Sequence, residues 1–211
     1  MPSRPRGTKS VMFAVSGNFI LTILKIIGFL VSNSSSLFSE TVHSFADTLN
    51  QSFLLIGIKR SRRKPDEDFP FGYGSERFLW AVISACGIFF LGAGITMYHG
   101  VSALWRDETP ELNALTFLIL IIAFIIESFT LYIAVQELRS HHAESSFLQA
   151  LAEGDPITVA VIYEDSVAVL GVIIAFLGIA LTEYTGNGVW DALGSIGVCF
   201  CLGVIAIMLI N

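Results

Sequence analysis

The chain has 211 residues, of which 54% are hydrophobic and only 14% are charged, and its formal net charge is −6. A soluble domain carries about 25% charged residues, so this composition, with a mean hydropathy of +0.70, excludes an ordinary soluble globular protein. Most charges lie in short segments between apolar runs, so the acidic balance does not identify a partner. We expect a membrane protein and no nucleic-acid partner.

Six apolar runs are long enough to cross a bilayer, whose core of about 30 Å needs about 20 helical residues. They lie at roughly 10–31, 37–58, 78–100, 113–138, 156–182 and 189–210. They predict an all-α membrane protein with six transmembrane helices in one domain, 10–211, after a cytoplasmic N-terminal segment, 1–9. No cleaved signal peptide is expected, because a full-length apolar run follows the basic first residues.

The basic residues predict the orientation of these helices. Ten of the twelve Lys and Arg residues flank segments that share one side of the membrane if both termini are cytoplasmic, whereas Arg106 lies on the other side. Lys25 is the twelfth and lies within the first run. This positive-inside pattern predicts two cytoplasmic termini. We predict an integral protein of a bacterial inner membrane, with an organelle membrane as the alternative.

Ionisable residues inside the apolar runs mark the candidate site, because burying one in a bilayer costs at least about 2.5–3.5 kcal/mol. In chain order they are Lys25 in the first run, Glu40, His43 and Asp47 in the second, Glu127 in the fourth, and Glu164 and Asp165 in the fifth. Glu40 is expected to be a mouth or packing residue. Lys25 is expected either to pair with an acid or to extend towards the interface.

His43 and Asp47, within TVHSFADTLNQ, are four residues apart, so a helix places both side chains on one face. An imidazole and a carboxylate supply half of a tetrahedral divalent-metal site. Asp165 lies at a matching depth, about 13 Å from the cytoplasmic end of its helix against about 16 Å for Asp47, at 1.5 Å per residue. Glu127 lies at a similar depth. These depths predict one metal ion near the bilayer middle.

Alternatives remain open for several of these residues. His43 and Asp47 can simply hydrogen-bond to each other without binding metal. Glu127 can be a protonated carboxyl that hydrogen-bonds to the backbone of a neighbouring helix. Glu164 and Asp165 are adjacent, about 100° apart on a helix, so only one is expected to face the site.

A metal site among deprotonated ligands indicates exchange chemistry, because metal binding releases protons and protonation releases metal. An imidazole titrates near neutral pH, as such exchange requires. We therefore predict a secondary transporter, not an enzyme, that exports a divalent metal in exchange for protons. The metal is cargo and no cofactor is expected. The alternatives are a metal-dependent intramembrane hydrolase, although no H-E-x-x-H occurs, a non-transporting metal-binding scaffold, or a channel.

The sequence resembles the transmembrane domain of the cation diffusion facilitators, and within them the zinc-transporter-nine-like branch. The resemblance rests on SGNFILTILKIIGFLVSNSSSLFSETVHSFADTLNQ, RRKPDEDFPFGYGSER and EDSVAVLGVIIA, and the branch on GAGITMYHGVSALW, ESFTLYIAVQELR and TGNGVWDALGSIGV. It implies a homodimer, alternating access and a metal site formed by His43, Asp47 and Asp165. It also implies zinc as the first choice of cargo.

Two features depart from the family pattern. The histidine that usually precedes the fifth-helix aspartate by four residues is Val161 here, so we expect Glu127, Glu164, Asn50 or water to replace that ligand. A single histidine with carboxylates also admits manganese, cobalt or iron, because oxygen ligands favour harder ions. Family members usually continue into a cytoplasmic domain after the sixth helix, and this chain ends at Asn211, so that domain is expected to be absent from it.

Overall fold

The computed structural model describes residues 8–106, 110–142, 146–154 and 156–210, and its regular structure there is helical throughout. The helices are α1 (Thr8–Ser32), α2 (Ser35–Ser61), α3 (Glu76–Gly87), the π-helix η1 (Ile88–Gly94), α4 (Ile95–Arg106), α5 (Ala114–His141), α6 (Phe147–Glu153), α7 (Pro156–Thr185) and α8 (Val189–Ile210). The predicted N-terminal segment lies outside the described residues, apart from its last two positions. The all-α prediction is confirmed.

The six predicted runs coincide with helices to within a few residues, and the third corresponds to the succession α3–η1–α4. Among the described residues, five helical stretches are long and apolar enough to cross a membrane: α1, α3 to α4, α5, α7 and α8. Helix α2 has 27 residues but is too polar to be counted with them. The chain is therefore an integral membrane protein, while the sixth crossing and the orientation of the termini stay predictions.

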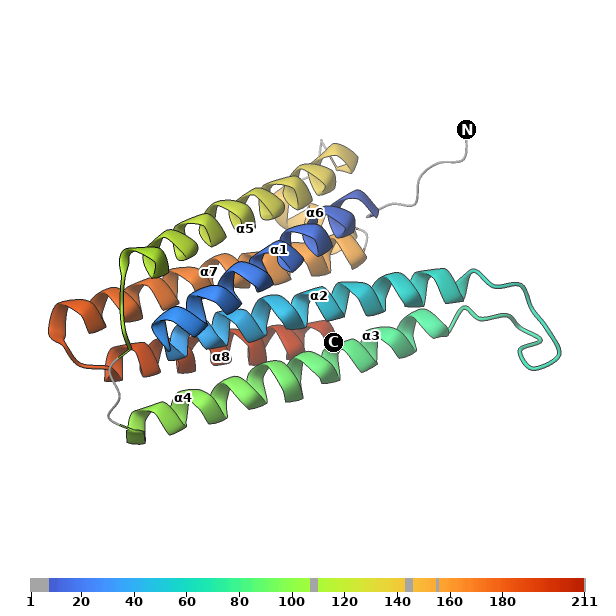
Figure 1. Ribbon diagram of the computed structural model, residues 1–211. Coiled ribbons are helices and arrows are strands. Elements are labelled where there is room, and N and C mark those ends of the chain that lie inside the picture. The colour runs from blue at the N-terminus through green and yellow to red at the C-terminus, as the bar shows by residue number, and fades with distance from the viewer. Residues whose placement is uncertain (1–7, 107–109, 143–145, 155, 211) are drawn as a thin grey trace.

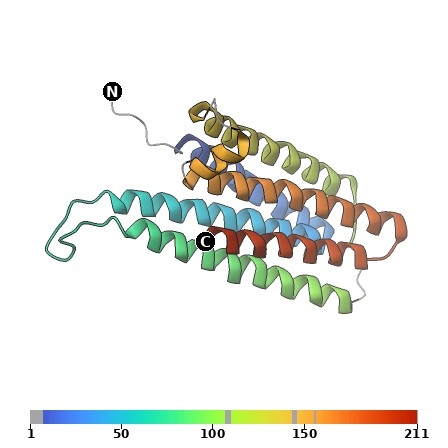
Figure 2. The same ribbon diagram turned by 180° about the vertical axis from the view of Figure 1, so that it is seen from behind.

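The helices lie side by side in an elongated bundle, and α2 runs through its middle (Figure 1). Helix α2 packs against α1, α3, α7 and α8, and α5 packs against α1 and α7. The start of α1 and the α2–α3 loop lie towards one end of the bundle, and the α7–α8 link lies at the other (Figures 1 and 2). The most polar long helix is therefore shielded by apolar ones.

The side chains are distributed as a lipid environment requires. Large apolar side chains such as Leu30, Phe78 and Phe200 face outward, with exposed fractions of 73%, 73% and 67%. The ionisable side chains near the middle of α1, α2, α5 and α7 are buried instead: Lys25, Glu40, His43, Asp47, Glu127, Glu164 and Asp165. In hydrocarbon a helix satisfies its own backbone, and polar side chains must find partners inside the bundle. The polar face of α2 thus determines which side of this helix points inward.

The start of α2 is held by a carboxylate from α8. Asp191 accepts hydrogen bonds from the Ser34 hydroxyl (2.7 Å) and from the backbone N–H groups of Ser35 (2.6 Å) and Ser36 (3.1 Å). Its own N–H donates to the Thr182 hydroxyl of α7 at 3.0 Å. The first N–H groups of a helix lack intrahelical partners and favour negative charge, so this contact ties α2 to α7 and α8.

Small residues allow α7 and α8 to approach closely at the same end. A Cβ atom added to Gly178 of α7 would lie 2.9 Å from the Trp190 carbonyl oxygen and 3.3 Å from the Gly194 Cα of α8. Close backbone approach at glycine is a typical way of packing helices in membranes. The link between α1 and α2 is also tight, and its Asn33 adopts the left-handed conformation with φ of 54°.

Two elements were not predicted. The π-helix η1 interrupts the third run, and the Cys199 thiol of α8 donates to the Ala93 carbonyl within it at 3.1 Å. Helix α6 occupies the link between α5 and α7. It begins with a capping box, in which Ser146 and Gln149 bond each other's backbone N–H groups, and the S-x-x-Q spacing is a sequence signal for such a start.

Candidate metal site

The middle of α2 carries His43 and Asp47, which their spacing of four residues places on one face of the helix. His43 and Asp47 are 1% and 2% exposed, and the distance from His43 Nε2 to Asp47 Oδ2 is 3.0 Å. Neither ring nitrogen of His43 makes a hydrogen bond of good geometry. The pair is therefore in contact, as the helical period requires, but the imidazole is not locked by well-directed hydrogen bonds.

Helix α7 places two carboxyl groups against this part of α2. Glu164 and Asp165 are both buried, with exposed fractions of 1% and 3%, and both lie close enough to Asp47 to interact with its charge. Glu164 accepts a hydrogen bond from the Asn50 amide, whose own oxygen accepts one from Ser84 of α3. The asparagine thus links α2, α3 and α7 beside the site.

Several polar atoms in this region lack a hydrogen-bond partner. Among the described residues they are His43 Nδ1, Ser44 Oγ, Glu164 Oε2 and Asp165 Oδ2, whereas His43 Nε2 has its 3.0 Å contact with Asp47. A buried polar group without a partner costs about 1–3 kcal/mol, so a cluster of them requires an explanation. A polar ligand between α2 and α7, such as a metal ion, a proton or water, would supply the partners that these atoms lack.

The predicted ligands are not all assembled. Within the described parts of the chain, no three His, Cys, Asp and Glu side chains stand close enough together to hold one metal ion. His43 and Asp47 are in contact on one helix, whereas Asp165 belongs to the neighbouring α7. The ligand set therefore stays a prediction, and it requires side chains to move across the contact between α2 and α7.

Glu127 is engaged elsewhere. Its Oε1 accepts a hydrogen bond from Lys25 Nζ of α1 at 2.7 Å, and Glu40 Oε2 of α2 accepts from the same nitrogen at 2.6 Å. Lys25 and Glu40 are 0% exposed and Glu127 is 1% exposed. Lys25 therefore pairs with acids, one of its two expected behaviours. Glu40, expected to be a mouth or packing residue, packs inside the bundle, where it is bonded to Lys25 of α1 and lies against Gly171 of α7.

Val161, at the position of the family histidine, belongs to an apolar cluster. It is 1% exposed and packs with Ala134 and Leu138 of α5, Ala150 of α6 and Ile162 of α7. A methyl-bearing side chain in this environment offers no ligand atom. The position of the missing histidine ligand is therefore part of the apolar packing, and another group must complete any set of four ligands.

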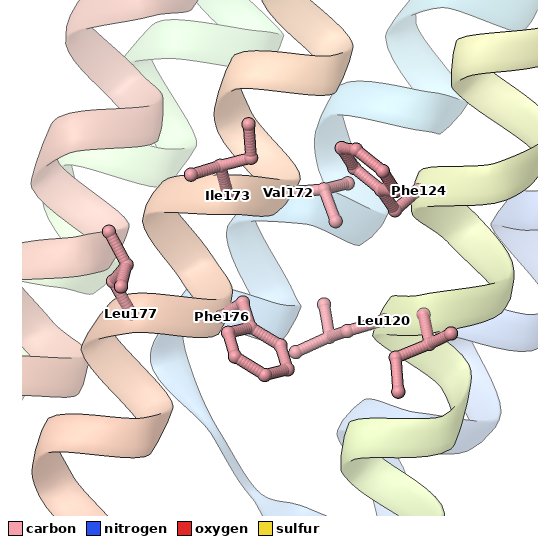
Figure 3. A pocket seen from close by; sticks show the side chains of 7 residues that line it. Leu120, Phe124, Val172, Ile173, Phe176 and Leu177 are labelled. Carbon is pink, nitrogen blue, oxygen red and sulfur yellow. The ribbon is translucent and has the colours of Figure 1, made fainter.

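Apolar hollows on the bundle are unsuitable for an ion. One of about 230 Å³ lies between α5 and α7 (Figure 3), and it is lined by Leu120, Ile121, Phe124, Val172, Ile173, Phe176 and Leu177. Another, of about 400 Å³, lies between η1 and α8. Neither lining includes an Asp, Glu, His or Lys side chain, and the Cys199 thiol in the second one donates to the Ala93 carbonyl. A bare cation is strongly disfavoured among hydrocarbon groups. The polar face of α2 is thus the better candidate.

Comparison with known sequences assigns the family. The model of the cation efflux transmembrane domain matches residues 11–210. The chain therefore belongs to the cation efflux family, which places it with transporters rather than enzymes. The resemblance drawn from the sequence motifs is confirmed.

Individual relatives agree with this assignment. The chain is 40% identical over 205 residues to the mitochondrial proton-coupled zinc antiporter SLC30A9 of Homo sapiens, covering 96% of this chain and 36% of that protein. It is 39% identical over 206 residues to metal tolerance protein C4 of Arabidopsis thaliana, with coverages of 96% and 45%. It is 30% identical over 106 residues to magnetosome protein MamB of Magnetospirillum gryphiswaldense, with coverages of 49% and 35%. The chain thus spans less than half the length of these relatives.

Proposed function

We propose that this chain forms the transmembrane pathway of a secondary transporter that exports a divalent metal, zinc first, from the cytoplasm in exchange for protons. Membership of the cation efflux family supports metal transport. The name of the human relative, a proton-coupled zinc antiporter, supports both the metal and the counter-ion. Zinc is cargo in this proposal and not a resident cofactor.

One observation carries the proposal. The buried His43 and Asp47 of α2 lie close to the buried carboxyl groups of α7, and some of their polar atoms have no partner among the described residues. We assign His43, Asp47 and Asp165 as the metal ligands. Zinc takes nitrogen and oxygen ligands at about 2.0–2.2 Å, so the side chains must draw together from their unliganded separation. Glu164, beside Asp165 and close to Asp47, is the preferred fourth candidate, since Glu127 is held by Lys25.

Proton exchange follows from the atoms of this proposed site. A metal ion and a proton compete for the same lone pairs on an imidazole or carboxylate, so protons leave when metal binds and return when it departs. A site that alternates between these occupants never carries the full charge of bare carboxylates through the bilayer. Movement of α7 relative to α2 would expose the site to the two sides in turn, as alternating access requires.

The ligand set also bears on the choice of metal. With one histidine and two or three carboxylates, manganese, cobalt and iron are the alternatives to zinc. We further propose a homodimer, as in the family that the chain resembles, and an organelle or bacterial inner membrane as its location. The human relative is named mitochondrial, which supports the organelle alternative.

The test is metal flux into proteoliposomes with an imposed pH gradient, using zinc and manganese. The protein, Asp47→Ala and the exposed matched control Glu153→Ala on α6 are compared. Flux that follows the proton gradient, is retained in the control and falls to the level of empty liposomes in Asp47→Ala supports the proposal. Flux that ignores the proton gradient would indicate a channel. Metal binding without flux would indicate a scaffold.

A further inference from the structure

Lys25 lies at the centre of a fully buried cluster of three charged residues, called here the ion triad: Lys25, Glu40 and Glu127. One nitrogen lies 2.6 Å from an oxygen of Glu40 and 2.7 Å from an oxygen of Glu127. The three residues come from α1, α2 and α5, and each is at most 1% exposed. With ionised side chains the triad has one more negative charge than positive, inside a membrane domain where unpaired charge is costly.

The two carboxyl groups of the triad offer more acceptor atoms than Lys25 uses. Glu40 Oε1 and Glu127 Oε2 are buried, and neither has a hydrogen-bond partner within the described parts of the chain. Four carboxylate oxygens around one small cation are the ligands that hard divalent metals prefer. The bonded oxygens would need to move inward by only about 0.5 Å to reach the metal–oxygen distance of about 2.1 Å.

The position of Glu40 is restricted by α7. A Cβ atom added to Gly171 of α7 would lie 2.5 Å from Glu40 Oε1, so the glycine leaves the room that this oxygen occupies. Glu40 is also three residues before His43 on α2, on the same side of the helix, and both Glu40 and Lys25 act electrostatically on His43. The triad thus adjoins the candidate metal site but has its own cation.

We propose that the Lys25 ammonium is a tethered cation that fills a second potential divalent-metal position between Glu40 and Glu127, and that it thereby keeps these carboxylates from binding cargo. Lys25 is a specificity-determining residue in this proposal. It restricts metal binding to the His43 side of α2 and holds α1, α2 and α5 together. Removing its charge leaves two buried carboxylates, and one divalent ion would neutralise both.

The experiment counts bound ions per chain in purified protein, with manganese followed by electron paramagnetic resonance and zinc by equilibrium dialysis. Lys25→Met is compared with its parent, both alone and in the Asp47→Ala background, and Lys25→Arg is the matched control. We expect Lys25→Met to bind one ion more than its parent in either background. Lys25→Arg should show no gain, and adding Glu40→Gln with Glu127→Gln should abolish the gain.

Three results would overturn the proposal. The first is a folded Lys25→Met protein that binds no more metal than its parent. The second is an ion that the Lys25-containing protein binds and that Glu127→Gln alone removes. The third is Lys25→Met protein that fails to fold both with and without manganese, because the metal would then not replace the ammonium. The number of ions that Lys25→Met binds is compared with the number bound by its own parent. The result therefore does not depend on whether Asp47 binds cargo.

Discussion

Two sections of α2 differ in whether their buried polar groups have hydrogen-bond partners. The first section, Ser34–Ser39, bonds its hydroxyl and N–H groups to α8, through Asp191 and through Ser195, whose hydroxyl lies 2.6 Å from that of Ser39. The middle section, His43–Gln51, also buries its polar residues His43, Ser44, Asp47, Asn50 and Gln51, but several of their side-chain atoms have no partner among the described residues. A fully bonded section fixes a helix, whereas a section with unused ligand atoms is suited to binding. The first three changes below test this contrast, and the fourth tests a bonded side chain in the loop after α2.

The largest effect is expected for Asp165→Asn on α7, which packs against the middle section of α2. Removing a proposed ligand should lower metal affinity by at least about 10- to 100-fold, the range found even for groups that only support a ligand. The same change keeps the size of the side chain and removes a carboxyl group whose charged form burial disfavours, so the metal-free protein should be no less stable. Metal titration and thermal unfolding in detergent measure the two effects. Loss of both affinity and stability would assign Asp165 a structural role.

Asp191→Ala should produce the opposite pattern at the first section. It leaves the Ser34 hydroxyl and the N–H groups of Ser35 and Ser36 without their acceptor, which should cost about 3 kcal/mol of stability. Metal affinity should stay within about threefold of the parent, since the change does not touch the proposed ligands. Asp191→Asn, which retains one acceptor oxygen, serves as the milder control. Unchanged unfolding of Asp191→Ala would show that this carboxylate does not anchor α2.

Gly178→Ala examines the close contact of α7 with α8 near the anchored section. The new methyl group would meet the backbone of α8, which cannot rotate away, so we expect a loss of about 1–3 kcal/mol. Gly203→Ala on α8 is the matched control, because a Cβ there has nothing within 4 Å. Thermal unfolding of both variants under identical conditions measures the difference. Equal stability would mean that α7 and α8 separate at little cost.

The smallest effect is expected in the loop after α2. Tyr73 donates a hydrogen bond to Asp66 at 2.6 Å, and this bond, with smaller contributions from Phe69 and Arg63, lowers the pKa of the Asp66 carboxyl. A lowered pKa stabilises the folded loop above the ordinary value of about 4, and this contribution is lost as pH falls through the lowered value.

Tyr73→Phe should therefore raise the pKa of Asp66 towards its ordinary value. Carbon-13 nuclear magnetic resonance of the Asp66 carboxyl measures the titration, and Tyr184→Phe, at an exposed tyrosine near the end of α7, is the control. An identical titration in the native protein and in Tyr73→Phe would contradict the role of this bond.

Much of the architecture follows from the sequence because each signal is local. Apolar runs of about 20 residues fix the helices. The spacing of four between His43 and Asp47 fixes their contact on one face. The polar content of α2 indicates that it lies inside the bundle, since a polar helix in lipid must be covered.

Other features depend on which helices are neighbours, and the sequence does not provide this order. At least five acids within the other runs could pair with Lys25, and only the adjacency of α1, α2 and α5 selects Glu40 and Glu127. The sequence shows Asp191 only as an acidic residue in the first turn of α8. Its hydrogen-bond partners, at the start of α2, lie about 155 positions earlier. The π-helix η1 gave no local signal, because its carbonyl contact with Cys199 comes from packing against α8.

The bond between Lys25 and Glu40 has a consequence for how the chain enters the bilayer during synthesis. Helix α1 carries a buried positive charge, and α2 is too polar to be counted among the membrane-crossing helices. Each alone would bring an uncompensated charge into hydrocarbon at a cost of about 2.5–3.5 kcal/mol. Only Asn33 and Ser34 separate the two helices, so they can enter as one hairpin with these charges already paired. The first step of biogenesis is then the insertion of a pair of helices, with Glu127 joining when α5 follows.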